Sequence, residues 1–105
     1  MQTTVYDRWN NTIYLTDERW EHILEFHEEM VDFHDEIFAT LRQGRRRQDP
    51  LEPSVYTYFY PFDHLPVGNT HIVVVVKFSF QSTDSGESSN NFVLTAFLKT
   101  IYSQR

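Results

Sequence analysis

The stretch that decides the fold is HIVVVVKFSF, residues 71–80, the most apolar run of the chain, and it contains one lysine, Lys77. Successive side chains of a strand point to opposite faces of a sheet. The alternation predicts a purely apolar face formed by Ile72, Val74, Val76, Phe78 and Phe80. It places on the other, mixed face His71, Val73, Val75, Lys77 and Ser79. We expect the apolar face to pack against helices and Lys77 to stand on the side away from them.

Two further strands are predicted, at residues 54–62 and 91–102, separated from the valine-rich strand by the polar segments DHLPVGN and STDSGESSN. No helix of useful length fits between these strands, so neighbours should pair antiparallel. The opening VYDRWNNTIYLT predicts a hairpin around its two asparagines, and RQGRRRQDPLEP predicts a loop.

A helical segment is expected to begin after Thr16, which reads as an N-cap, with acids in the first turn where the helix dipole favours them. Apolar residues then recur with helical spacing as far as Leu41, as one long helix or two shorter ones. The predicted fold class is therefore α+β, with an N-terminal helical segment packed on one face of an antiparallel sheet of three to five strands. A single domain should span residues 1–105.

Composition narrows the class of protein. The chain is 40% hydrophobic and 16% aromatic, which is typical of a folded globular protein and not of a disordered one. No run approaches the roughly 18 apolar residues of a membrane span, and the start lacks the pattern of a signal peptide. A cytoplasmic location and no membrane association are expected. Zero cysteines exclude disulfides and thiolate metal sites.

Charge is distributed unevenly around a net value of −6. Residues 16–36 contain nine acids and one base, whereas residues 37–105 contain seven bases and five acids. This asymmetry predicts an acidic face joined to a mildly basic remainder, which weakens the objection that a net negative charge raises against a nucleic-acid partner. The alternative is that the acids only solvate a helix flank.

Strand parity also predicts which side chains share a sheet face with Lys77. In the last strand, Thr95 and Lys99 fall on the mixed side, and the tyrosines of the first strand are expected to join them there. Lys77 would then stand beside phenol and threonine hydroxyls on a partly apolar surface, which is suited to a site. The alternative is an ordinary polar outer sheet face.

Several motifs in chain order, IYLTDERWEHILEFHEEM, an Asp-Pro loop, a tyrosine-rich strand, VVVVKFS and FVLTAF, resemble a family of small bacterial and phage proteins. The family belongs to the superfamily of barnase, EndoU, certain colicin ribonucleases and RelE toxins. The resemblance covers roughly residues 12–100. The matching residues are Leu15, Thr16, Trp20, His22, Ile23, His27, Glu29, Asp49, Pro50, Val93, Thr95 and Ala96.

This resemblance implies a RelE/barnase-like nuclease domain with metal-independent endoribonuclease activity, often as the toxin of a toxin–antitoxin pair. Two positions depart from the family pattern. Glu28 stands where the family has proline, which would let the helix run on, and Phe97 stands where it has tyrosine, which removes a hydroxyl. A member that has lost activity is therefore an open alternative.

RNA cleavage without metal needs a base for the 2′-hydroxyl, an acid for the leaving oxygen and cations for the phosphorane. The predicted catalytic residues are His22, Lys77, Tyr60 and Thr95. The predicted RNA-binding residues are Arg45, Arg46, Arg47, Tyr58 and His71. His22 and His27 are five positions apart and do not share a helical face, so no metal is expected, and no cofactor.

Each of these assignments has a plainer alternative. His22 could be a polar residue on the helix flank, His27 and His34 could be histidines at the edge of the core, and the arginine run could be a solvated cluster. The rival function is an inactive relative that binds a protein partner through a tyrosine-rich sheet face. The expected partners are RNA and an antitoxin protein, and a homo-oligomer is left open.

Overall fold

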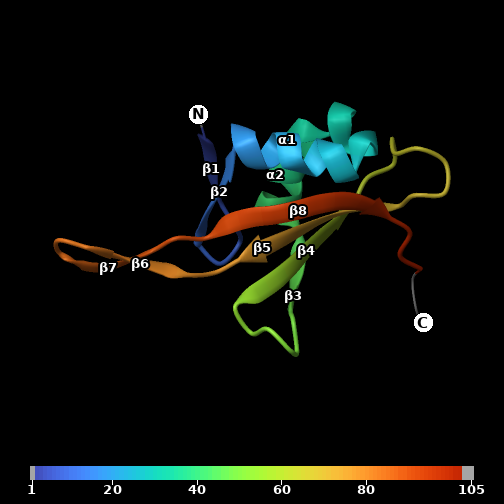
Figure 1. Ribbon diagram of the computed structural model, residues 1–105. Coiled ribbons are helices and arrows are strands. Elements are labelled where there is room, and N and C mark those ends of the chain that lie inside the picture. Colours follow the sequence, from blue (N-terminus) through green and yellow to red (C-terminus); the bar gives the residue numbers. More distant parts are fainter. Residues whose placement is uncertain (1, 103–105) are drawn as a thin grey trace.

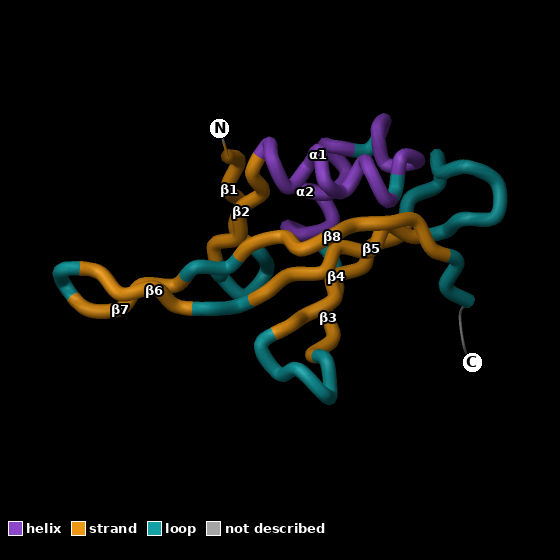
Figure 2. Tube along the Cα trace, in the orientation of Figure 1, coloured by secondary structure: helices purple, strands orange, loops and turns teal. Residues whose placement is uncertain are grey.

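In the computed structural model, which describes residues 2–102, a six-stranded sheet carries all the helices on one face (Figure 1). The helical layer consists of α1 (Asp17–Phe26), a 3₁₀ turn η1 (Glu28–Asp32) and α2 (His34–Gln43). The sheet strands are β1 (Gln2–Tyr6), β2 (Thr12–Thr16), β3 (Arg45–Gln48), β4 (Val55–Pro61), β5 (His71–Lys77) and β8 (Phe92–Lys99). Figure 2 shows the helical layer gathered on one side of the strands.

The sheet order is β1-β2-β8-β5-β4-β3, and its pairs are antiparallel except β2 with β8, which run parallel where Tyr14 faces Phe92. Two more strands, β6 (Phe80–Thr83) and β7 (Gly86–Ser89), form a separate ribbon that continues β5 and β8 and projects from the body (Figure 1). Every residue of this ribbon's two strands is exposed.

The α+β class and the helices packed on one sheet face are confirmed, but the antiparallel sheet of three to five strands is wrong. The N-terminal hairpin adds two strands beside β8 and makes the sheet mixed. The arginine run, predicted as a loop, forms β3 and pairs with β4. Pairing of β3 is possible because α2 ends at Gly44, where an added Cβ would clash with the carbonyl oxygens of Thr40 and Phe59.

Local signals at the N-terminus of the helical segment work as predicted. Thr16 caps α1, and its hydroxyl accepts a hydrogen bond of 3.0 Å from the Arg19 N–H. Asn10 sits in the β1–β2 turn with φ of 66°, a conformation that asparagine tolerates. The uninterrupted helix expected from Glu28 is not formed, because His27 leaves the helical conformation and η1 follows.

The core lies between the helical layer and the sheet. Its completely buried residues include Met30 from η1 and Ile37 and Leu41 from α2. From β5 it receives the apolar set predicted for the helix side, with Ile72, Val74 and Val76 each 0% exposed. The predicted set extends too far only at Phe80, which is 72% exposed in the projecting ribbon.

Strand register overturns the predicted position of the tyrosines. Directly paired residues share a face, and Tyr56, Tyr58 and Tyr60 pair with Val76, Val74 and Ile72. All three tyrosines therefore belong to the helix-covered face, opposite Lys77. The alternation within β4 is as predicted, but the alignment of β4 with β5 differs from the prediction.

A β-bulge opposite Val75 and Val76 corrects the predicted parity of the last strand, which places Phe92 on the apolar face and Val93 on the mixed face. Beyond it, β8 keeps Thr95, Phe97 and Lys99 on the side away from the helices, as predicted. Before it the parity is reversed, so Val93 is 1% exposed in the core while Phe92 pairs with Lys77.

Candidate functional site

The sheet face away from the helices, here called the open face, brings together most of the predicted basic residues. It follows from the register that this face is formed by Arg45, Arg47, Thr57, Phe59, His71, Val73, Val75, Lys77, Thr95, Phe97 and Lys99. Thr57, Phe59, Val75 and Phe97 are partly exposed, so the face is semi-apolar with basic groups at its ends and edge.

The two faces of the molecule differ sharply in charge. Strands β3, β4, β5 and β8 contain no aspartate or glutamate, whereas residues 17–43 of the helical layer contain nine. The acidic segment and the basic residues Arg45, Arg47, Lys77 and Lys99 therefore lie on opposite sides of the sheet. A polyanion would be repelled by one side and accepted by the other.

Two adjoining hollows run over the open face and its β3 edge. The first, here called the His71 pocket, has a volume of about 320 Å³ and is lined by Arg8, Gln43, Arg45, Phe59, Tyr60, Pro61 and His71. The second, the Phe97 groove, has a volume of about 450 Å³ and is lined by Arg47, Thr57, Phe59, Val73, Val75, Phe97, Lys99, Thr100 and Ile101. Phe59 lines both, so the two hollows adjoin at its side chain.

Thr70, the last residue of the loop between β4 and β5, holds His71 in place. Its Nδ1 lies 2.7 Å from the Thr70 hydroxyl, which accepts a 2.9 Å hydrogen bond from the Ile101 N–H. Burial lowers the pKa of His71 below its ordinary value of 6.5. The imidazole is therefore neutral at neutral pH and able to accept a proton.

Lys77 stands at the opposite end of β5 from His71. Its Nζ donates a 2.7 Å hydrogen bond to the Ser54 hydroxyl and lies 3.6 Å from a carboxylate oxygen of Glu52. Thr95 shares its face, opposite Val75. Lys77 is thus on the predicted surface, where it also ties β5 to the loop between β3 and β4.

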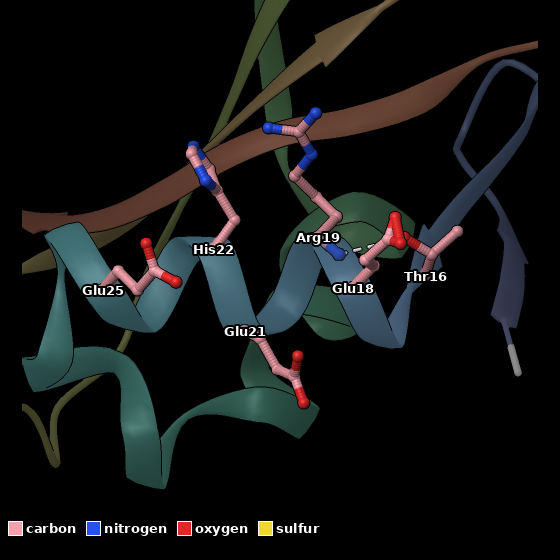
Figure 3. A pocket seen from close by; sticks show the side chains of 6 residues that line it. All are labelled: Thr16, Glu18, Arg19, Glu21, His22 and Glu25. Atoms are coloured by element: carbon pink, nitrogen blue, oxygen red, sulfur yellow. Dashed lines mark hydrogen bonds between the residues drawn. The ribbon is translucent and has the colours of Figure 1, made fainter.

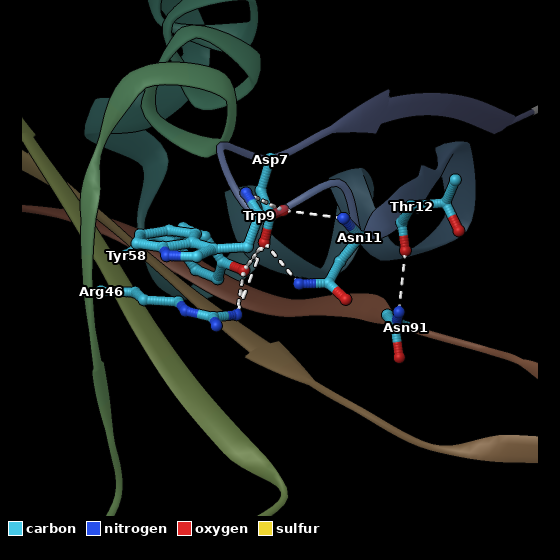
Figure 4. Close-up of polar contacts among 7 residues, drawn as sticks. All are labelled: Asp7, Trp9, Asn11, Thr12, Arg46, Tyr58 and Asn91. Atoms are coloured by element: carbon cyan, nitrogen blue, oxygen red, sulfur yellow. Dashed lines mark hydrogen bonds and ion pairs between the residues drawn. The ribbon is translucent and has the colours of Figure 1, made fainter.

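Arg46 and Tyr58, both predicted to bind RNA, lie instead in a cluster on the helix-covered side (Figure 4). The side chain of Asp7 is 0% exposed, accepts a hydrogen bond from the Tyr58 hydroxyl and lies 3.5 Å from the Arg46 guanidinium. The guanidinium also stacks on the rings of Trp9 and Tyr56, at 4.1 and 4.5 Å from their centroids.

This cluster joins the N-terminal hairpin to β3 and β4. Asp7 also accepts hydrogen bonds from the backbone N–H groups of Trp9 and Asn11, so its carboxylate is well satisfied. Burial, followed by the hydrogen bond to Asp7, raises the pKa of Tyr58 well above its ordinary value. Arg46 and Tyr58 are therefore committed to the fold.

His22 is separated from the other predicted catalytic residues. It lies on the exposed side of α1 in a shallow hollow of about 400 Å³ that is lined also by Thr16, Glu18, Arg19, Glu21 and Glu25 (Figure 3). Its ring packs against Phe26, with centroids 5.0 Å apart. Three glutamates make this hollow unfavourable for phosphate.

The His71 pocket thus joins three predicted residues, Tyr60, Arg45 and His71, with two that sequence reasoning missed, Arg8 and Phe59. The parity of β4 carried a signal for Phe59, since it alternates with the tyrosines. Arg8 carried none, because it lies in a turn that only the folded hairpin brings to the edge of the sheet.

Comparisons with protein-family models, with curated proteins and with solved structures find no match to this chain. Within residues 2–102, no group of three or more histidine, aspartate or glutamate side chains is arranged to hold a metal ion. Over the same residues, no helix has the length and apolarity needed to cross a membrane.

Proposed function

We propose that this protein binds single-stranded RNA on its open face and cleaves it without a metal ion. The observation that carries the proposal is the open face itself, a sheet surface whose strands contain no acidic residue, with two phenylalanines among basic groups and two adjoining hollows. The resemblance of the sequence to a ribonuclease superfamily supports the cleavage half of the proposal.

The open face offers what an unpaired RNA strand requires. Phe59 and Phe97 are partly exposed aromatic rings on which bases can stack, and stacking is tolerant of sequence. Arg47 and Lys99 line the same groove and can neutralise phosphates. Paired bases hide their faces from such rings, so a single strand should bind better than a duplex.

The rival function required an open tyrosine surface. The pairing of β4 with β5 directs Tyr56, Tyr58 and Tyr60 to the helix-covered face, and Tyr58 is 0% exposed. A protein partner would therefore have to use a different surface from the one predicted.

The test is binding and cleavage of a fluorescent single-stranded RNA in EDTA, compared with the duplex and with single-stranded DNA of the same sequence. We expect the single strands to bind more tightly than the duplex, and only RNA to be cut, because cleavage uses the 2′-hydroxyl. The double variant Arg47→Gln/Lys99→Gln should weaken binding. Its matched control, Arg42→Gln in the helical layer, should not. Equal binding by both variants would contradict the proposed surface.

A further inference from the structure

We propose that the His71 pocket holds the phosphate that is cleaved and that His71 is the residue that takes the proton from the 2′-hydroxyl. The proposal rests on the proposed function and assigns its chemistry to one place. It replaces the set predicted from sequence, because His22 lies on α1 and Lys77 at the far end of β5.

The pocket is built to receive a phosphate. Arg8 reaches it from the β1–β2 turn and Arg45 from β3, so two guanidinium groups from separate elements line one hollow. Guanidinium groups bind phosphate with charge-assisted, often bidentate hydrogen bonds. Gln43 adds a neutral donor, and the hollow of about 320 Å³ is larger than a phosphate group, which leaves room for the attached ribose.

The position of the pocket also fits a continuing strand. Phe59 forms a wall shared with the Phe97 groove, so a nucleotide stacked in the groove would place its neighbouring phosphate near the pocket. Arg47 and Lys99 then accompany the strand along the open face. The groove therefore supplies binding, and the pocket supplies the reacting position.

His71 has the state and the support that a general base requires. Its Nδ1 is engaged by the Thr70 hydroxyl, so Nε2 is the nitrogen left for a substrate. The ionisable groups that face it are Arg8 and Arg45 in the pocket, Tyr60 beside them, and Lys99 directly opposite in the register with β8. These neighbours include no carboxylate, and the imidazole is neutral at neutral pH.

The step balances with His71 and solvent water. His71 Nε2 accepts the 2′-hydroxyl proton as the 2′ oxygen forms a bond to phosphorus, and the bond from phosphorus to the 5′ oxygen breaks. A water molecule gives a proton to the leaving 5′ oxygen, and the protonated His71 returns its proton to the hydroxide that remains. The products are a 2′,3′-cyclic phosphate and a 5′-hydroxyl end, with Arg8 and Arg45 stabilising the charge of the phosphorane.

The experiment compares His71→Asn with wild type in a cleavage assay in EDTA and in a binding assay on an RNA whose 2′-hydroxyls are replaced by hydrogen. We expect cleavage to fall by about 100-fold or more, in the range of general acid–base catalysis, with binding changed by less than about threefold. His64→Asn, a surface histidine paired with Glu36 outside both hollows, is the matched control and should cleave normally.

A second variant and a pH profile guard against a misfolded protein. Arg8→Gln alters an exposed turn residue and should lower cleavage more than binding. In wild type, kcat/KM should rise with pH on the acid side, with a midpoint below 6.5, and this limb should vanish in any residual activity of His71→Asn.

The outcomes separate this proposal from the one on which it rests. If His71→Asn and Arg8→Gln cleave as fast as wild type, or if His22→Asn abolishes cleavage while they do not, the His71 assignment is overturned and the ribonuclease proposal stands. If wild type binds RNA without cutting it, the His71 assignment and the cleavage half fall together, and RNA binding stands. If wild type does not bind RNA, the proposed function fails as well.

Discussion

The two faces of the central sheet are made from the same strands and have opposite chemistry. On the helix-covered face, Val74 and Val76 are completely buried and the Tyr58 hydroxyl, buried there as well, is paired with Asp7. On the open face, Val75 and Phe97 are only partly covered, with arginines and lysines around them. Residues that alternate along one strand are thus divided between the packed core and the face that we propose contacts RNA.

The largest loss of stability is expected when Asp7, on the helix-covered side, is replaced. The change Asp7→Ala leaves the Tyr58 hydroxyl and the Arg46 guanidinium without their carboxylate, and loss of one partner of a buried ion pair costs about 3–5 kcal/mol. Urea denaturation should show this loss. Asp84→Ala, in the exposed ribbon, should leave the midpoint unchanged, and equal midpoints for the two variants would contradict the structural role of the cluster.

Two neighbouring valines of β5, one on each face, allow the stability contributed by the two faces to be compared directly. Val74→Ala empties space in the core and should lower the free energy of unfolding by about 2 kcal/mol. Val75→Ala acts on the open face and should cost clearly less, because that side chain is already partly exposed. Thermal and urea unfolding of the pair measure the difference, and an equal cost would show that the open face is covered in solution.

A substitution on the open face should change RNA binding and leave stability almost unchanged. Phe97→Ala should weaken binding of single-stranded RNA by about 1–3 kcal/mol, the usual value of one stacked base, with little effect on stability. Fluorescence anisotropy measures the affinity. Phe26→Ala, an exposed phenylalanine on α1, is the control, and a similar loss of affinity in both variants would refute a specific stacking surface.

The smallest effect is confined to alkaline pH. Because the folded state raises the pKa of Tyr58 above its ordinary value of 10.0, the folded form holds the phenol proton more tightly than the unfolded form. The stability contributed by this residue is complete below pH 10 and is lost as pH rises above it. The melting temperature should therefore fall more steeply above pH 10 in wild type than in Tyr58→Phe. Parallel curves would show that the phenol is not desolvated.

The sequence was sufficient for features that depend on neighbouring residues. The N-cap at Thr16, the two-sided character of β5 and the acidic helical layer all follow from short-range pattern and composition. The position of the tyrosines did not, because parity within β4 is local whereas its alignment with β5 depends on pairing. The burial of Arg46 was equally hidden, since its partner Asp7 lies in a distant hairpin.

The same division holds for the candidate site. Lys77, Thr95, His71, Arg45 and Arg47 lie on the open face, and Tyr60 reaches the His71 pocket. Grouping His22 with Lys77 failed, because residue chemistry alone does not give the distance between a helix flank and a sheet face. Arg8 needed the folded hairpin before it could be recognised.

The bulge in β8 has a consequence for how this chain tolerates changes in length. Leu94 is the extra residue of the bulge, so deleting it would leave Val93 opposite Val76 and Thr95 opposite Val75, with both side chains on their present faces. Loss of two residues from the tip of the β6–β7 ribbon keeps the alternation intact. The ribbon can therefore be shortened in even steps and β8 by its bulge residue alone, whereas deleting a regularly paired residue such as Ala96 would move the residues on one side of it to the opposite face.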